Sequence, residues 1–82
     1  MDSSNKREWL GWSVVVGDVV VNDLNQTQAR RKVEEKLNAG VPHEALVVKH
    51  RGRKVLYWSA NVLGNRNLSV VLRGPDKKIH YV

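Results

Sequence analysis

The chain has 82 residues, no cysteine and a formal net charge of +6. A chain of this length forms one domain with a small core, and without thiols it has neither a disulfide framework nor a thiolate metal site. No apolar run approaches the ~20 residues needed to cross a bilayer, and the polar start lacks the apolar block of a secretory signal. We therefore expect one intracellular domain, cytoplasmic or nuclear, over residues 1–82, with residues 1–8 as a flexible lead.

The positive charge is concentrated in the second half of the chain. Residues 1–44 carry six Lys/Arg and seven Asp/Glu, whereas residues 45–82 carry eight Lys/Arg and one acid, Asp76. Such asymmetry favours an anionic partner for the second half. A basic surface that is merely solvated would give the same composition.

Residues 12–22 have the pattern of a β-hairpin. Gly17-Asp18 separates two valine triplets, and glycine at the first central position suits a two-residue type II′ turn. Pairing of Val16 with Val19 gives the hairpin one apolar face. That face carries Trp12, Val14, Val16, Val19 and Val21.

Residues 24–40 predict a helix. Asn25 is a natural N-cap, Gln28 completes a capping box, and Gly40 ends the helix in the left-handed conformation. The apolar residues recur every four positions and form a narrow stripe. They are Ala29, Val33 and Leu37. A stripe this narrow predicts a helix that lies across a sheet rather than in a bundle.

The remainder of the chain predicts further strands. Residues 46–57 predict a second hairpin with Arg51-Gly52 at its tip, and residues 61–67 have turn composition around Gly64-Asn65. Residues 68–73 alternate between apolar and polar positions, as a half-buried strand does. After a turn at residues 74–76, residues 79–82 predict one more short strand.

The order strand, strand, helix, strand, strand, strand predicts an α+β domain of two layers. We expect a mixed sheet of four to five strands with one helix packed on one of its faces.

Two segments of the chain resemble ubiquitin. Gly40-Val41-Pro42 and the run Leu46–Val55 resemble ubiquitin's Gly-Ile-Pro and the strands on either side of its Ala-Gly-Lys turn. Leu68–Gly74 resembles ubiquitin's Leu-His-Leu-Val-Leu-Arg strand, and Thr27 opens the helix about where the family has a threonine. The resemblance covers residues 12–74 in element order. It implies the β-grasp fold, in which the last strand lies beside the third.

The chain also departs from ubiquitin. Gly74 is followed by Pro75 rather than by a second glycine, so the resemblance implies a protein that is not conjugated to lysine. Lys49 stands where ubiquitin displays the isoleucine of its apolar patch, whereas Val71 matches the valine of that patch. The usual apolar recognition surface is therefore half replaced by charge.

We expect a non-catalytic protein-interaction module that binds through the outer face of its sheet. Placing the last strand beside the third, as in ubiquitin, puts Lys49 and Arg73 on one solvent-facing surface. Valines there would supply buried apolar area, and the cations would steer an acidic partner. The expected partner-binding residues are Val47, Lys49, Arg51, Arg53, Lys54, Trp58, Val71 and Arg73.

Three alternatives stay open at this stage. The same cations would serve a nucleic-acid-binding β-grasp domain, with Trp58 stacking on a base. An ordinary charged hairpin, whose lysines discourage edge pairing, needs no partner at all. A homodimer through an edge strand at Val19–Val21 is the third.

The sequence offers no clear catalytic constellation. His43, His50 and His80 are not at metal-ligand spacing, and no carboxylate cluster accompanies them. The serines lack a nucleophile-elbow context, and the six glycines form neither a P-loop nor a dinucleotide fingerprint. We therefore expect no enzyme activity, no metal and no cofactor.

Overall fold

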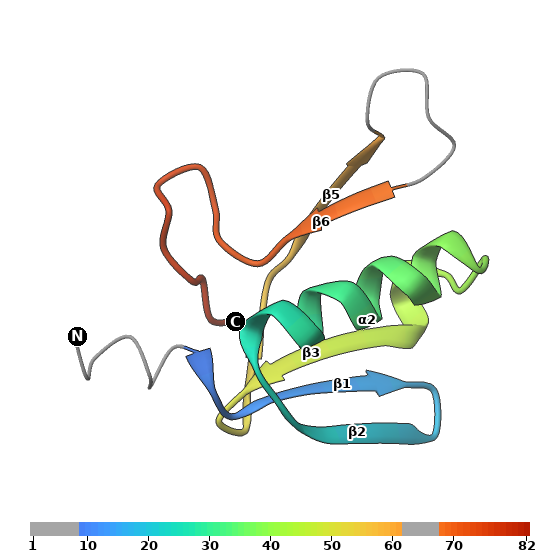
Figure 1. Cartoon of the computed structure of the whole chain (residues 1–82), viewed down its shortest axis with the longest axis horizontal. Helices are drawn as coiled ribbons and strands as arrows, with labels where there is room; N and C mark the ends of the chain where they lie inside the picture. Colours follow the sequence, from blue (N-terminus) through green and yellow to red (C-terminus); the bar gives the residue numbers. More distant parts are fainter. Residues whose placement is uncertain (1–8, 62–67) are drawn as a thin grey trace.

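The computed structural model describes residues 9–61 and 68–82 (Figure 1). The lead expected at residues 1–8 and the turn expected at Gly64-Asn65 lie outside the described residues. In chain order the elements are β1 (Trp12–Val16), β2 (Val19–Leu24), α2 (Gln26–Asn38), the 3₁₀ helix η1 (His43–Ala45), β3 (Leu46–His50), β4 (Arg53–Val55), β5 (Trp58–Asn61) and β6 (Leu68–Val71).

The main sheet has four strands in the order β2-β1-β3-β4, and every neighbouring pair is antiparallel. The first hairpin has the predicted register from Val16 opposite Val19 to Val14 opposite Val21, and Gly17 has a φ of 57°. A register shift between Val14 and Trp12 then places Trp12 opposite Leu24. Of the expected apolar face, Trp12 and Val14 are buried, whereas Val19, at the turn, is 61% exposed. At the tip of the second hairpin, Arg51 and Gly52 both have positive φ, at 54° and 85°. Positive φ at both central residues identifies a type I′ turn.

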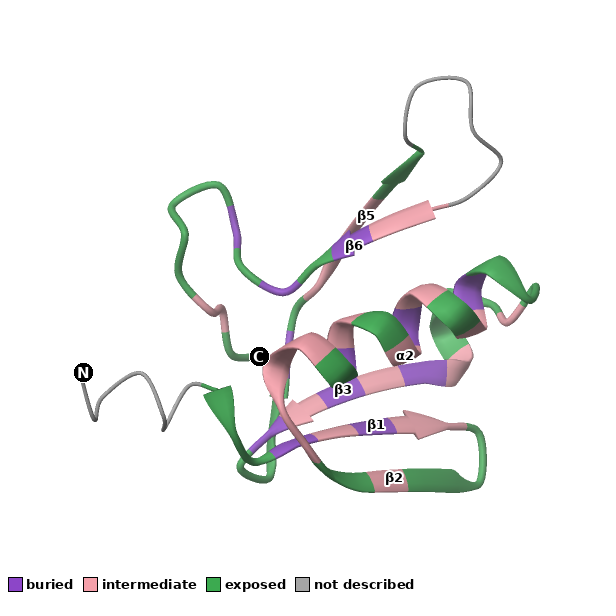
Figure 2. Ribbon diagram, in the orientation of Figure 1, coloured by how far each residue is buried: buried purple, intermediate pink, exposed green. Residues whose placement is uncertain are grey.

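The helix α2 has the predicted capping residues but is shorter than the expected 24–40, since Leu24 belongs to β2 and the helix spans Gln26–Asn38. The Asn25 side chain accepts a hydrogen bond from the Gln28 N–H, and the Gln28 side chain accepts one from the Asn25 N–H. Gly40 follows the helix with a φ of 99°. The stripe residues are buried against the inner face of the main sheet, where Figure 2 shows a line of buried positions. These residues are Ala29, Val33 and Leu37.

The strand at Leu68–Val71 does not take the position expected from ubiquitin. It pairs with β5, with Val71 opposite Trp58, in a separate two-stranded sheet. β1 pairs directly with β3, with Val14 opposite Val48, so no strand lies between them. For this reason the main sheet is antiparallel rather than mixed. The described residues thus form a small α+β fold with one α-helix, and a β-grasp is not confirmed.

Polar side chains of α2 hold the edge of β6. The Glu34 carboxylate accepts a hydrogen bond from the Val70 N–H at 2.9 Å. The Asn38 amide accepts one from the Leu68 N–H at 2.7 Å and donates one to the Leu68 carbonyl at 3.3 Å. These bonds satisfy backbone groups that a neighbouring strand would otherwise satisfy. The ribbon of β5 and β6 is therefore attached to the helix.

The end of the chain returns to the main sheet beside β4. Tyr81 forms a bridge with Val55, the Leu56 N–H donates to the His80 carbonyl, and the Val82 N–H donates to the Lys54 carbonyl. This bridge takes the place of the short strand predicted at residues 79–82. The predicted turn before it is present, with the Lys77 N–H donating to the Gly74 carbonyl at 2.8 Å.

Within residues 9–61 and 68–82, no helix has both the length and the apolar character needed to span a bilayer.

Candidate functional site

The eight expected partner-binding residues fall into two separate regions. In β3, Val47 and Lys49 alternate with the buried Leu46, Val48 and His50, so they face away from the helix. On that outer face Val47 lies opposite Val15 of β1, and Lys49 lies opposite Lys54 of β4. We call Val47, Lys49 and Lys54 the sheet face.

Like charges directly opposite each other on adjacent strands repel. Lys49 and Lys54 form such a pair on the sheet face. Arg53 lies opposite the buried His50 and so belongs to the other face, where its guanidinium carbon is 4.7 Å from the centre of the Tyr81 ring. Arg51 is in the turn itself. The cations of the hairpin are thus divided between the two faces of the sheet.

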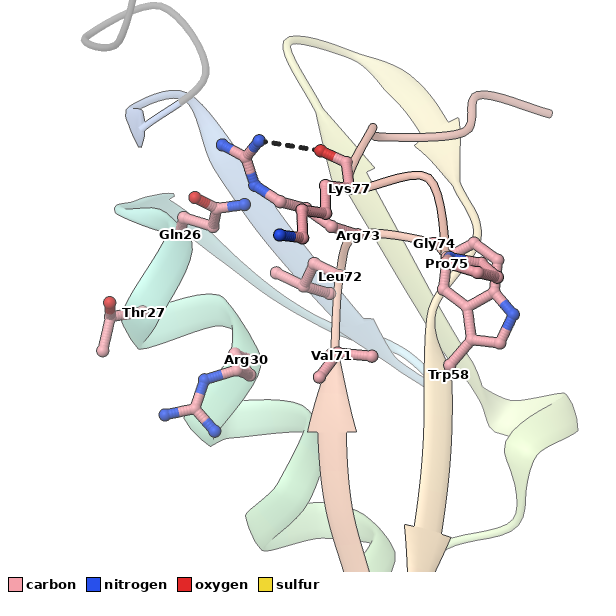
Figure 3. A pocket seen from close by; sticks show the side chains of 10 residues that line it. All are labelled: Gln26, Thr27, Arg30, Trp58, Val71, Leu72, Arg73, Gly74, Pro75 and Lys77. Carbon is pink, nitrogen blue, oxygen red and sulfur yellow. Dashed lines mark hydrogen bonds between the residues drawn. The ribbon is translucent and has the colours of Figure 1, made fainter.

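Trp58, Val71 and Arg73 belong to a different region, a hollow of about 650 Å³ beside the first turns of α2 (Figure 3). The expected juxtaposition of Arg73 with Lys49 depended on β6 lying beside β3, and β6 instead pairs with β5. We call this hollow the groove. Its lining residues are Gln26, Thr27, Arg30, Trp58, Val71, Leu72, Arg73, Gly74, Pro75 and Lys77.

The groove has two walls and an apolar floor. In Figure 3, Thr27 and Arg30 come from the helix on one side, Trp58 and Pro75 lie on the other, and Leu72 lies between them. Leu72 is buried, and the neighbouring Val71 is half exposed. Because side chains alternate along an extended chain, Leu72 packs into the core at the base of the groove, whereas Val71 is exposed to the groove.

The wall around Trp58 is tightly packed. The Trp58 ring meets the His80 ring edge-on, with 5.6 Å between their centres. A Cβ atom at Gly74 would lie 2.9 Å from His80 Nε2 and 3.1 Å from the Trp58 ring, so only glycine fits there without a shift of these rings. His80 is in turn held by Asp76, with 2.8 Å between its Nε2 and the carboxylate. Trp58 is therefore fixed in position at the groove.

Three cations and no acidic residue are among the described residues that line the groove. Arg30 is paired with Glu34, one turn further along the helix. Arg73 donates a hydrogen bond to the Lys77 carbonyl at 3.1 Å. Both guanidinium groups are therefore held by neighbours while they line the hollow.

The three histidines lie in separate environments. His50 is buried beside Trp12, His80 contacts Asp76, and His43 Nδ1 lies 2.9 Å from the Tyr57 hydroxyl. Burial, with a smaller contribution from Glu44, raises the pKa of Tyr57. Among residues 9–61 and 68–82, no three His, Cys, Asp or Glu side chains are grouped as a metal site would need.

Arg30 and Pro75 line the groove but were not predicted from the sequence, and Lys77 was noted only as one of the later cations. A signal for Arg30 was present, because Arg30, Glu34 and Asn38 recur every four residues beside the apolar stripe. Such spacing places them along one side of the helix. Two of them contact β6, and the third reaches the groove.

Comparisons with protein-family models, with curated proteins and with solved structures give no match for this chain. The chemistry of the groove and of the sheet face therefore has to be inferred from the residues that form them.

Proposed function

We propose that this chain is a non-catalytic protein-interaction module and that its partner docks in the groove. The observation that carries the proposal is a concave surface that combines an apolar lining with a fixed tryptophan and a rim of cations. Tryptophan and arginine dominate binding energy at protein interfaces, and partially enclosed apolar pockets are where such anchors act.

Kinship with ubiquitin-like domains is part of the proposal. It is supported by the order of the elements through residue 61 and by Val71, which is half exposed and matches the valine of ubiquitin's recognition patch. The pairing of β6 with β5 is the feature that differs most from that family. Gly74 is buried against His80 and Trp58, which supports a protein that is not conjugated through this glycine. An intracellular location, consistent with a chain without cysteine, is proposed as well.

Nucleic-acid binding is the second candidate, and the sheet face is the observation that favours it. Lys49 and Lys54 repel each other across the strand pair, and a bound phosphate would relieve that repulsion. Arg51, at the tip of the same hairpin, adds a further cation. The groove, in contrast, has a largely apolar lining.

The test compares two aspartate substitutions at apolar side chains of similar exposure. Val71 is 50% exposed in the groove, and Leu56 is 47% exposed outside it. The immobilised chain and both variants are exposed to lysate with and without nuclease treatment. Captured proteins are quantified by mass spectrometry, and captured nucleic acid is quantified by gel staining. We expect Val71→Asp to lose at least about tenfold in the recovery of specific partners, because it buries a charge at the anchor. Leu56→Asp is expected to retain them.

Two results would contradict the proposal. One is equal capture by both variants, which would place the docking surface elsewhere. The other is recovery of nucleic acid, sensitive to Lys49→Gln and Lys54→Gln, in place of protein. Val19 and Val20 on the edge strand β2 are exposed, and such an edge can pair with a second copy of the chain. Sedimentation of the purified chain measures whether this homodimer forms.

A further inference from the structure

The cations of the groove come from three different parts of the chain. Arg30 is on α2, Arg73 follows β6, and Lys77 is in the turn after Pro75. Three positive charges that line one hollow repel one another, and this electrostatic repulsion is unfavourable unless negative charge is bound. With Glu34 neutralising part of Arg30, the described residues that line the groove still carry an excess of positive charge.

The two arginines are already held in place. Arg30 is restrained by its pair with Glu34, whose carboxylate also accepts the Val70 N–H, and Arg73 is restrained by the Lys77 carbonyl. A guanidinium group that is already ordered loses less side-chain entropy when it binds a carboxylate. The first turn of α2 also contains no acidic residue, so the positive end of the helix dipole is not neutralised there.

The size and lining of the groove limit what can occupy it. A hollow of about 650 Å³ accommodates a few side chains rather than a broad protein surface. Trp58, Val71 and Pro75 offer a place for an apolar side chain beside the cations. Nucleic acid fits this lining less well, since affinity for nucleic acid comes largely from cations that neutralise successive phosphates, whereas the lining here is mainly apolar.

We propose that the groove binds a short acidic segment of the partner protein. A carboxylate of that segment pairs with Arg73 and Lys77 and is attracted by Arg30, while an adjacent apolar side chain packs against Trp58 and Val71. This proposal rests on the proposed function, because it assigns the chemistry of a partner that docks in the groove. Charge complementarity with a cationic rim is what selects an acidic occupant.

The experiment uses two defined peptides and the isotopically labelled full chain. The first peptide is acetyl-Asp-Leu-Glu-Leu-Asp-amide, and the second replaces each acid by its amide. The readout is the indole N–H signal of Trp58, assigned with Trp58→Phe, together with the amide signals from Val71 to Lys77. We expect the acidic peptide to shift these signals in a saturable way and the amide peptide to bind at least about tenfold more weakly.

Charge-matched variants separate recognition in the groove from attraction by the whole protein. Arg73→Gln with Lys77→Gln removes two cations from the groove, and Arg31→Gln with Lys78→Gln removes two from neighbouring positions outside it. The first pair should weaken binding of the acidic peptide about tenfold or more. The second pair should change the affinity for the acidic peptide by less than about twofold, because these two side chains do not contact the bound peptide and salt screens their charge.

Each contrary outcome overturns a defined statement. Equal binding of the two peptides, or equal effects of the two double variants, would overturn acidic recognition. An absence of peptide binding, combined with partner capture that Val71→Asp abolishes, would overturn this ligand class and leave protein docking intact. Stronger shifts of Trp58 with an oligothymidine of about eight nucleotides would overturn both proposals in favour of single-stranded nucleic acid.

Discussion

At the scale of single residues, His50 links three parts of the chain. Its ring is 3% exposed and stacks on Trp12 with 4.5 Å between their centres. Nε2 lies 3.0 Å from the Leu10 carbonyl, which can only accept, so Nε2 carries a proton. Nδ1 then accepts the Tyr81 hydroxyl at 2.6 Å. One tautomer thus satisfies both nitrogens inside the core.

We expect His50→Ala to lower the free energy of unfolding by about 2–4 kcal/mol, because it removes a packed ring and two buried hydrogen bonds. Urea unfolding measures this difference. The comparison is His43→Ala, where the histidine is exposed and a much smaller loss is expected. Equal losses at the two positions would show that His50 does not stabilise the core in this way.

Asp76 supplies a prediction about pH. The hydrogen bond from His80, and then that from the Lys78 N–H, lower the pKa of Asp76 below its usual value of 3.8. A carboxyl group with a lowered pKa in the folded state stabilises the protein above the unfolded pKa, and this contribution is lost as the pH falls through the folded pKa. We expect Asp76→Asn to remove part of the decline in stability below about pH 4. The free energy of unfolding is measured between neutral and acid pH for the parent chain and for Asp76→Asn. An equal decline of this free energy in the two proteins would contradict the prediction.

At the scale of elements, the two hairpin turns differ in how well their residues suit them. The first places Gly17 at the position of positive φ, whereas the second places Arg51 there, at 54°. A residue with a β-carbon in the left-handed region loses about 1 kcal/mol relative to glycine, and asparagine offsets part of this cost because its short side chain forms local hydrogen bonds. The Arg51 N–H nevertheless donates to the Gly11 carbonyl at 2.8 Å, so the turn has a second support.

We therefore expect Arg51→Asn to stabilise the protein by up to about 1 kcal/mol, since asparagine followed by glycine is the preferred type I′ pair. Thermal unfolding provides the measurement. The matched change Arg53→Asn should destabilise the protein, because it removes the cation from the Tyr81 ring. Arg53 does not have a positive φ, so asparagine brings no conformational gain there. A lower melting temperature for Arg51→Asn than for the parent would contradict the reasoning.

At the scale of the whole molecule, two sheets share one helix. The main sheet packs its inner face on α2, whereas the β5–β6 ribbon is attached by Val70, Leu72 and the side chains of Glu34 and Asn38. A two-stranded sheet is marginally stable by itself in water. The ribbon, which also carries Trp58 and Val71 of the groove, should therefore open more readily than the main sheet.

Hydrogen exchange tests this order of opening. We expect amide protons paired between β5 and β6 to exchange faster than those paired between β1 and β3. Asn38→Ala should accelerate the ribbon amides further, about fivefold or more, because it removes two hydrogen bonds to Leu68. Arg31→Ala on the exposed side of α2 is the control. Equal acceleration across both sheets would mean that the molecule opens as one unit.

Features that depend on neighbours close in the sequence were predictable. The capping box of Asn25 and Gln28, the glycine after the helix and the register of the first hairpin all follow from chemistry within four residues. The buried stripe on α2 follows from helical periodicity in the same way. The outward orientation of Val47 and Lys49 was predictable too, because side chains alternate along a strand.

The partners of the last strands were settled only by the tertiary structure. The alternation at Leu68–Val71 fits any sheet that offers an apolar face, so it does not specify whether β3 or β5 lies beside it. The strand at Trp58–Asn61 was missed, since its pattern is short and polar, and with it the pairing that carries Trp58 and Val71 to the groove. Local hydrogen bonds and periodicity are written into consecutive residues, whereas the choice between distant strands depends on how the whole core packs.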